Sequence, residues 1–177
     1  MRRAQCPGCK ASHYQYKAIL DRYAETMPGT VKYLVKDYPL NSRCNVYVAA
    51  GVGHPAPCEA AVVVRLATER SKREPMIDWA FAHQEATADI VRDRAKTELG
   101  ITDFAAEYAR LIPEIKRDIA DGGALTIPVT PTYYINGVRA LTPDNHWLDE
   151  KYFDYAIRYE LNNGTLGPSG SGSPAKK

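Results

Sequence analysis

The chain has 177 residues, of which 45% are hydrophobic and 25% are charged, a composition typical of one globular domain. Its formal net charge of +2, with acidic and basic residues interspersed, argues against a nucleic-acid-binding protein. The longest apolar run, at 60–64, is far too short to span a bilayer. No apolar segment follows the basic residues at the start, so we recognise no export signal there.

The first predicted element is a helix at about 7–27, in which apolar and aromatic residues recur at spacings of three and four. Pro28 and Gly29 are expected to end it. Branched and aromatic residues then alternate with lysines at about 30–37, which predicts a strand. Residues 39–54 are rich in Asn, Ser, Gly and Pro and predict a loop.

Helical patterns fill the middle of the chain, at 56–72, 75–84, 87–100 and 102–123. Gly100 stands where a C-cap is expected, and Thr102 or Asp103 is the expected N-cap of the last helix. Pro113 within that helix is expected to break or kink it. Phe81 is expected to pack in the core rather than line a peptide groove.

A hairpin and a final helix are predicted after residue 130. Asn136-Gly137, flanked by alternating apolar residues, is the strongest short-range hairpin signal. The last helix is predicted at about 147–161, with its buried stripe formed by Trp147, Tyr152, Phe153, Ile157 and Leu161. The Gly, Ser and Pro composition of 164–177 predicts a disordered tail.

The pair Cys6 and Cys9 admits two main interpretations, half of a zinc site or a redox pair. A zinc site needs a second compact pair, but Cys44 and Cys58 have thirteen residues between them, so we disfavour a metal. Two residues between cysteines at a helix N-terminus let the sulfurs meet across one turn. The spacing therefore favours a redox pair over a plain structural disulfide or two inert thiols.

The helix start also assigns different roles to the two cysteines. Its N–H groups and the positive end of its dipole stabilise a thiolate on Cys6, which we expect to be the more exposed sulfur and the nucleophile. Cys9, one turn inside the helix, would resolve the mixed disulfide. This chemistry needs no cofactor.

Three further features complete the set of candidate site residues. Pro131 between two threonines is predicted to have a cis bond that presents the backbone of Thr130 to Cys6 and to an extended substrate; the alternative is a trans proline at a strand start. Cys44 and Cys58 bracket a loop rich in Gly and Pro, which favours a structural disulfide worth roughly 3 kcal/mol. A second redox pair is the alternative for these two cysteines.

These motifs carry a family resemblance. "CPGC", "VKYLVKDYPL", "RCN", "HPAPCEAA", "TPTYYINGV" and the last helix resemble DsbA-type thioredoxin-like oxidoreductases over about 5–161. The form "YPLNSRCN…HPAPCEAA" is especially similar to thioredoxin-like domains fused to vitamin K epoxide reductase-type membrane proteins. The resemblance implies that Cys6 and Cys9 form the active site and that Pro131 is cis. It also implies an extracytoplasmic protein that oxidises thiols.

The resemblance implies an α/β fold of the thioredoxin-like, DsbA-like class, with a domain at 1–163 and a helical insertion at about 55–123. Its first central strand would be truncated, since only "MRRAQ" precedes Cys6. We therefore expect the chain to be part of a longer exported or membrane-anchored protein. The implied partners are substrate proteins with thiols or disulfides, and a membrane quinone-linked enzyme of the vitamin K epoxide reductase or DsbB type.

The sequence thus predicts a thiol:disulfide oxidoreductase that acts mainly as an oxidase through Cys6 and Cys9. A disulfide reductase or isomerase uses the same residues and is one alternative. A binding module that keeps the thioredoxin fold without activity is the other.

Overall fold

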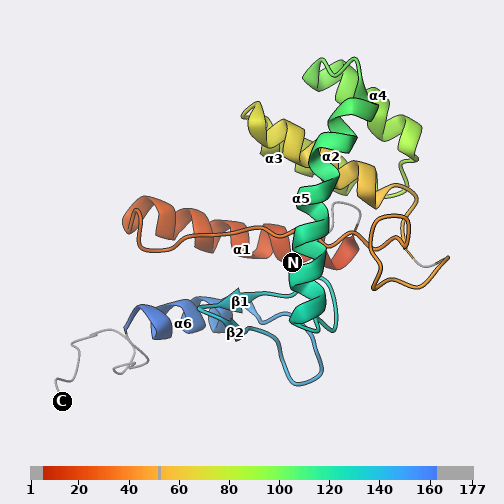
Figure 1. The fold of residues 1–177 in the computed structure, drawn as a ribbon. Coiled ribbons are helices and arrows are strands. Elements are labelled where there is room, and N and C mark those ends of the chain that lie inside the picture. The colour runs from red at the N-terminus through yellow and green to blue at the C-terminus, as the bar shows by residue number, and fades with distance from the viewer. Residues whose placement is uncertain (1–5, 52, 163–177) are drawn as a thin grey trace. The chain divides into compact units, whose positions relative to one another are not determined.

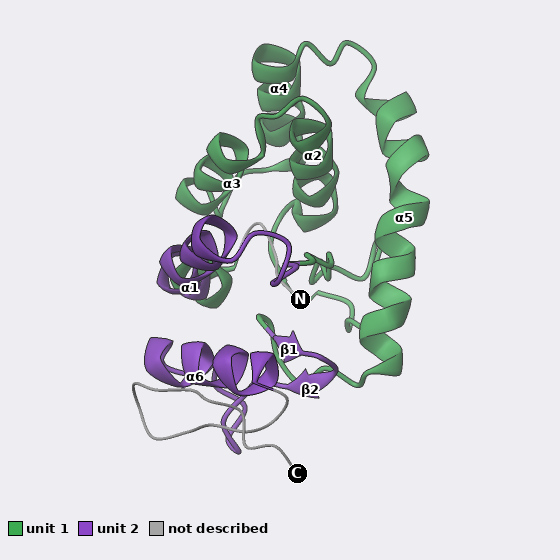
Figure 2. Ribbon diagram, turned by 90° about the vertical axis from the view of Figure 1, so that its left-hand side faces the viewer, with its two compact units in different colours: residues 1–11, 34–131 green, residues 12–33, 132–177 purple. Residues whose placement is uncertain are grey.

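A computed structural model describes residues 6–51 and 53–162, and in these ranges it has six helices and one two-stranded hairpin (Figure 1). Residues 1–5, where the first central strand is expected to be truncated, and the tail expected at 164–177 lie outside the described residues. The chain divides into two compact units, residues 1–11 with 34–131 and residues 12–33 with 132–177 (Figure 2). Helix α1 (Pro7–Thr26) contributes to both.

The first unit is built mainly from four helices, α2 (Pro57–Glu69), α3 (Arg73–Ala82), α4 (Ala88–Leu99) and α5 (Phe104–Ala124). Helix α2 packs against the other three and is the central one. Its residues from Pro57 to Val63 are all buried, because small Ala and branched Val side chains allow neighbours on every face. Leu66, Val91 and Ile115 lie at the centre of this core.

The ends of these helices follow local sequence signals. Gly100 has φ 69° and ends α4, as predicted, because glycine adopts the left-handed region without steric cost. The Asp103 side chain accepts a hydrogen bond from the Ala106 N–H at 3.0 Å and caps α5. Helix α5 continues through Pro113 without a break, since its apolar face of Leu111, Ile115 and Ile119 is packed in the core.

The second unit joins most of α1 to a short hairpin and to α6 (Glu150–Leu161). Strands β1 (Tyr134–Ile135) and β2 (Val138–Arg139) pair antiparallel. Positive φ angles at both turn residues, 46° at Asn136 and 85° at Gly137, match the predicted hairpin turn. The core of this unit consists of Tyr16, Ile19, Tyr23, Phe153 and Ile157.

Two predicted elements differ from the structure. Residues 31–36 have no regular secondary structure, and Lys32, Tyr33 and Leu34 are exposed. A strand requires hydrogen bonds to a neighbouring strand, which an alternating pattern cannot supply by itself. Helix α6 begins at Glu150 instead of 147, since Trp147 forms an isolated bridge with Leu141.

The predicted stripe on the last helix is only partly correct. Phe153 and Ile157 are buried, and Trp147 and Leu161 pack against the same core. Tyr152, in contrast, is 55% exposed, because as the neighbour of the buried Phe153 it points about 100° away from the buried face of α6.

Candidate active site

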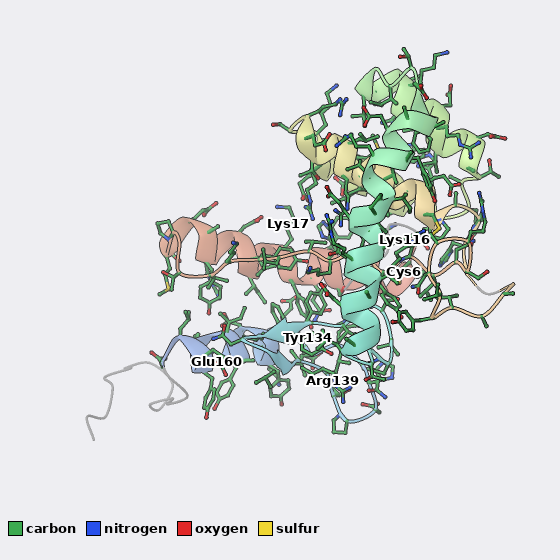
Figure 3. The ribbon with its side chains drawn as sticks, viewed as in Figure 1. Cys6, Lys17, Lys116, Tyr134, Arg139 and Glu160 are labelled. Carbon is green, nitrogen blue, oxygen red and sulfur yellow. A yellow bond between two sulfur atoms is a disulfide. The ribbon has the colours of Figure 1, made fainter. Side chains whose placement is uncertain are left out.

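Cys6, labelled in Figure 3, stands directly before the first residue of α1. The backbone N–H of Cys9 donates to the Cys6 sulfur at a N–Sγ distance of 3.1 Å. The Lys10 N–H donates to the Cys6 carbonyl oxygen at 2.9 Å, so Cys6 caps the helix. N–H groups at this end of a helix have no acceptor within the helix, and they attract negative charge. The arrangement is suited to holding a thiolate on Cys6.

Both cysteine thiols are buried. Cys6 is 2% exposed and Cys9 is 0% exposed, so the expected difference in exposure between the two residues is very small. Ile77 and Phe81 of α3 and Val64 of α2 pack against the pair. The sequence pattern predicted only the position of the cysteines on α1. Their burial depends on α3, which lies about seventy residues further along the chain. Phe81 is a core residue, as predicted, but its core includes the two cysteines.

The segment around Pro131 lies beside Cys6. The Thr130–Pro131 peptide bond is cis, the geometry that the sequence predicted. The Cys6 thiol donates to the Thr130 carbonyl oxygen at a distance of 3.6 Å. The Thr130 hydroxyl is buried and has no hydrogen-bond partner among the residues that the structure describes. The structure therefore brings together Cys6, Cys9 and Thr130 from two distant parts of the chain.

Cys44 and Cys58 form a disulfide with an S–S distance of 2.04 Å, as predicted. Cys58 is the second residue of α2, so the bond ties the preceding loop to the central helix of the first unit. The loop is also closed by Asn45, which is 0% exposed and whose side-chain amide donates to the Pro39 carbonyl at 2.9 Å. A link between the loop and the central helix of the first unit favours a structural role.

This disulfide also bears on the zinc interpretation. Bonded to each other, Cys44 and Cys58 cannot supply the second pair of thiolate ligands that Cys6 and Cys9 would need. Within the described residues, no group of three or more His, Cys, Asp or Glu side chains is arranged to hold a metal ion.

An ion-pair cluster in the first unit was missed by sequence reasoning. Arg65 on α2 donates to Asp37 at 2.7 Å, to Glu114 at 2.9 Å and to Asp118 at 2.5 Å. Lys36 pairs with Asp121 and Asp118, and these hydrogen bonds raise the pKa of Lys36. No local pattern signals this cluster, since its members come from three separate segments.

Comparison with known proteins identifies the family. The family model described as Thioredoxin matches residues 3–150, which is most of the chain. No curated protein and no solved structure gave a significant match. Among the described helices, none is long and apolar enough to cross a membrane. The extent of the family match, together with a cysteine pair at a helix start, leads to one conclusion: the chain belongs to the thioredoxin family.

Proposed function

We propose that this protein is a thiol:disulfide oxidoreductase, with Cys6 as nucleophile and Cys9 as resolving thiol, and that it acts mainly as an oxidase. One observation carries the proposal: the Cys9 N–H donates to the Cys6 sulfur at 3.1 Å at the N-terminus of α1. This N–H would stabilise the Cys6 thiolate each time that sulfur is released. Membership of the thioredoxin family supports thiol–disulfide exchange as the chemistry.

Oxidation of a substrate would proceed in two exchange steps. A substrate thiolate attacks the Cys6 sulfur of the Cys6–Cys9 disulfide, that bond breaks, and Cys9 leaves as a thiolate. A second substrate thiolate then attacks the substrate sulfur of the mixed disulfide and releases the Cys6 thiolate. The substrate gains a disulfide and loses two electrons and two protons, which the two cysteines receive. The structure corresponds to the resulting dithiol form.

Thr130 and Pro131 are proposed to bind the substrate. The Thr130 carbonyl lies 3.6 Å from the Cys6 sulfur, so a peptide attached to Cys6 would pass along this segment of backbone. Extended peptides commonly bind by main-chain hydrogen bonds to an exposed edge, with specificity coming from neighbouring pockets.

We further propose that the protein is of the DsbA type, with α2–α5 as its helical insertion, and that it resembles the domains fused to vitamin K epoxide reductase-type proteins. On this proposal it works outside the cytoplasm and is re-oxidised by a membrane quinone-linked enzyme. The Cys44–Cys58 disulfide supports an oxidising compartment, because such bonds are rare in reducing ones. Trapping the redox state of Cys6 and Cys9 in cells, with and without such an enzyme, tests this: an unchanged reduced fraction would refute it.

The roles of the two cysteines predict opposite behaviour of two variants. Cys9→Ser should accumulate mixed disulfides with reduced, unfolded substrate protein, because the resolving thiol is missing. Cys6→Ser, the matched control, should accumulate none. Non-reducing electrophoresis followed by peptide mapping measures both, and equal trapping by the two variants would contradict the assignment.

The direction of catalysis is tested by equilibrating the Cys6–Cys9 pair with a series of glutathione ratios. An oxidising potential is expected for the proposed oxidase. A strongly reducing potential would favour the reductase or isomerase. The absence of any reversible couple would favour a binding module without activity.

A further inference from the structure

A pair of hydroxyl groups connects the two chain segments that carry the candidate active site. Ser12 lies on α1, three residues after Cys9, and is 0% exposed. Its Oγ is 3.0 Å from the phenolic oxygen of Tyr133. Tyr133 lies three residues after Thr130. Ser12 and Tyr133 therefore each lie three positions after a candidate active-site residue, Cys9 and Thr130 respectively.

The Tyr133 side chain is held in place by neighbouring aromatic rings. Its ring makes edge-on contacts with Tyr16, at 4.9 Å between centroids, and with Phe153, at 5.5 Å. Tyr16 and Phe153 are themselves stacked at 3.8 Å. The Tyr133 carbonyl accepts a hydrogen bond from the Ala140 N–H at 2.8 Å, which holds its backbone. The hydroxyl that meets Ser12 is thus presented by a fixed ring on a fixed backbone.

The contact between Cys6 and Thr130 differs from the Ser12–Tyr133 hydrogen bond in one respect that matters for thiol–disulfide exchange. The Cys6 sulfur changes its partner in every catalytic cycle, so its 3.6 Å contact with the Thr130 carbonyl is lost and remade. The Ser12 and Tyr133 hydroxyls take no part in sulfur chemistry. Their bond can persist while Cys6 is joined to Cys9 or to a substrate.

We infer that Ser12 and Tyr133 are a positioning pair for thiol–disulfide exchange. Their hydrogen bond maintains the alignment of the start of α1 with the segment that begins at Thr130, and so holds the Thr130 backbone ready for a peptide attached to Cys6. The inference rests on the proposed function and adds two residues to it. Both residues act by positioning, because the reacting sulfurs belong to Cys6 and Cys9.

The test uses single and double variants of the full chain with two probes. The first probe is an extended cysteine-containing peptide in mixed disulfide with thionitrobenzoate. The reduced protein attacks the peptide sulfur and releases coloured thionitrobenzoate, and Cys9 then frees the peptide thiol as the Cys6–Cys9 disulfide forms. The second probe is iodoacetamide, which alkylates Cys6 without binding along the Thr130 segment.

Tyr133→Phe and Ser12→Ala should each slow exchange with the peptide by about 10- to 100-fold, the usual effect of small misplacements at an active site. Alkylation of Cys6 by iodoacetamide should stay unchanged, because neither substitution alters the Cys9 N–H that stabilises the Cys6 thiolate or the α3 side chains that bury it. The double variant removes both hydroxyls together, so neither is left facing the apolar replacement of the other, and its stability should exceed that of either single variant. Its exchange with the peptide should stay slow.

Tyr134→Phe is the matched control, because it removes a hydroxyl from the next residue, which makes no side-chain hydrogen bond among the described residues (Tyr134 is labelled in Figure 3). It should exchange at the rate of the unaltered protein. Recovery of exchange together with stability in the double variant would overturn the inference, since it would show a purely structural role. Failure of the unaltered protein to exchange at all would instead overturn the proposed function.

Discussion

At the scale of single residues, Arg65 has the most partners among the ionic side chains described. Its guanidinium meets the carboxylates of Asp37, Glu114 and Asp118, which come from two segments of the first unit. The Arg65 and Asp118 side chains are only 22% and 10% exposed, so water replaces the lost partner poorly when one is removed. Exposed pairs behave differently, because solvent and salt screen them.

Replacing Arg65 with Met should therefore lower the free energy of unfolding by about 2–4 kcal/mol, since it leaves the Asp118 carboxylate buried with less compensation. Arg110 is the matched control, as it also bonds two carboxylates, those of Glu69 and Glu107, but on an exposed surface. Arg110→Met should cause little change. Urea denaturation of both variants measures the difference, and equal losses would show that burial of the Arg65 cluster is unimportant.

At the scale of elements, the loop before α2 depends on a covalent link. Residues 39–56 contain no helix or strand among those described, and the disulfide from Cys44 to Cys58 closes the loop over a sequence separation of 14. Close packing restricts it further, because a Cβ on Gly53 would lie 1.6 Å from the Leu40 carbonyl oxygen. The order of this segment thus comes from tertiary contacts and one bond.

Replacing both Cys44 and Cys58 with Ala should lower the free energy of unfolding by roughly 3 kcal/mol, because the unfolded chain gains the entropy of an open loop. Thiol–disulfide exchange by the Cys6–Cys9 pair should continue, since a structural link carries no electrons. Denaturation curves and exchange assays below the melting temperature measure the two effects. Loss of exchange with unchanged stability would indicate that Cys44 and Cys58 relay electrons instead.

At the scale of the whole molecule, buried tyrosines in both units make stability sensitive to high pH. Burial raises the pKa of Tyr16 and Tyr23 in the second unit and of Tyr38 and Tyr108 in the first. The pKa of Tyr23 is raised from its ordinary value of 10.0 to about 12, and burial is the largest cause of this shift. A hydrogen bond from its hydroxyl to Asp154, 2.7 Å long, adds to this shift.

The free energy of unfolding should therefore fall as the pH rises from about 10 to about 12. Below that window both states hold the phenolic protons, so these tyrosines add no pH dependence. Within it the unfolded chain releases protons that the folded chain retains, and unfolding becomes more favourable. Circular dichroism and tyrosinate absorbance, followed together through an alkaline titration, measure this effect.

Tyr23→Phe should flatten the fall in stability, and Tyr152→Phe, at a position that is 55% exposed, should leave it unchanged. Ionisation of all 12 tyrosines near pH 10 without loss of structure would contradict the argument.

The sequence by itself determined the features that depend on neighbouring residues. The N-cap at Asp103, the C-cap at Gly100 and the Asn136-Gly137 turn were predictable, because each is a property of a few adjacent side chains and their allowed φ angles. The position of Cys6 and Cys9 at a helix start was predictable for the same reason. The Cys44–Cys58 disulfide was predicted from the composition of the loop between these two cysteines.

Only the tertiary structure decided the features that depend on distant partners. The pattern at 30–37 alternates like a strand, yet residues 31–36 form none, because a strand needs a neighbour to accept its hydrogen bonds. The burial of Cys6 under α3 and the bond between Ser12 and Tyr133 join segments about seventy and 121 residues apart. Side chains so far apart in sequence leave no local pattern, since their meeting depends on how the helices pack.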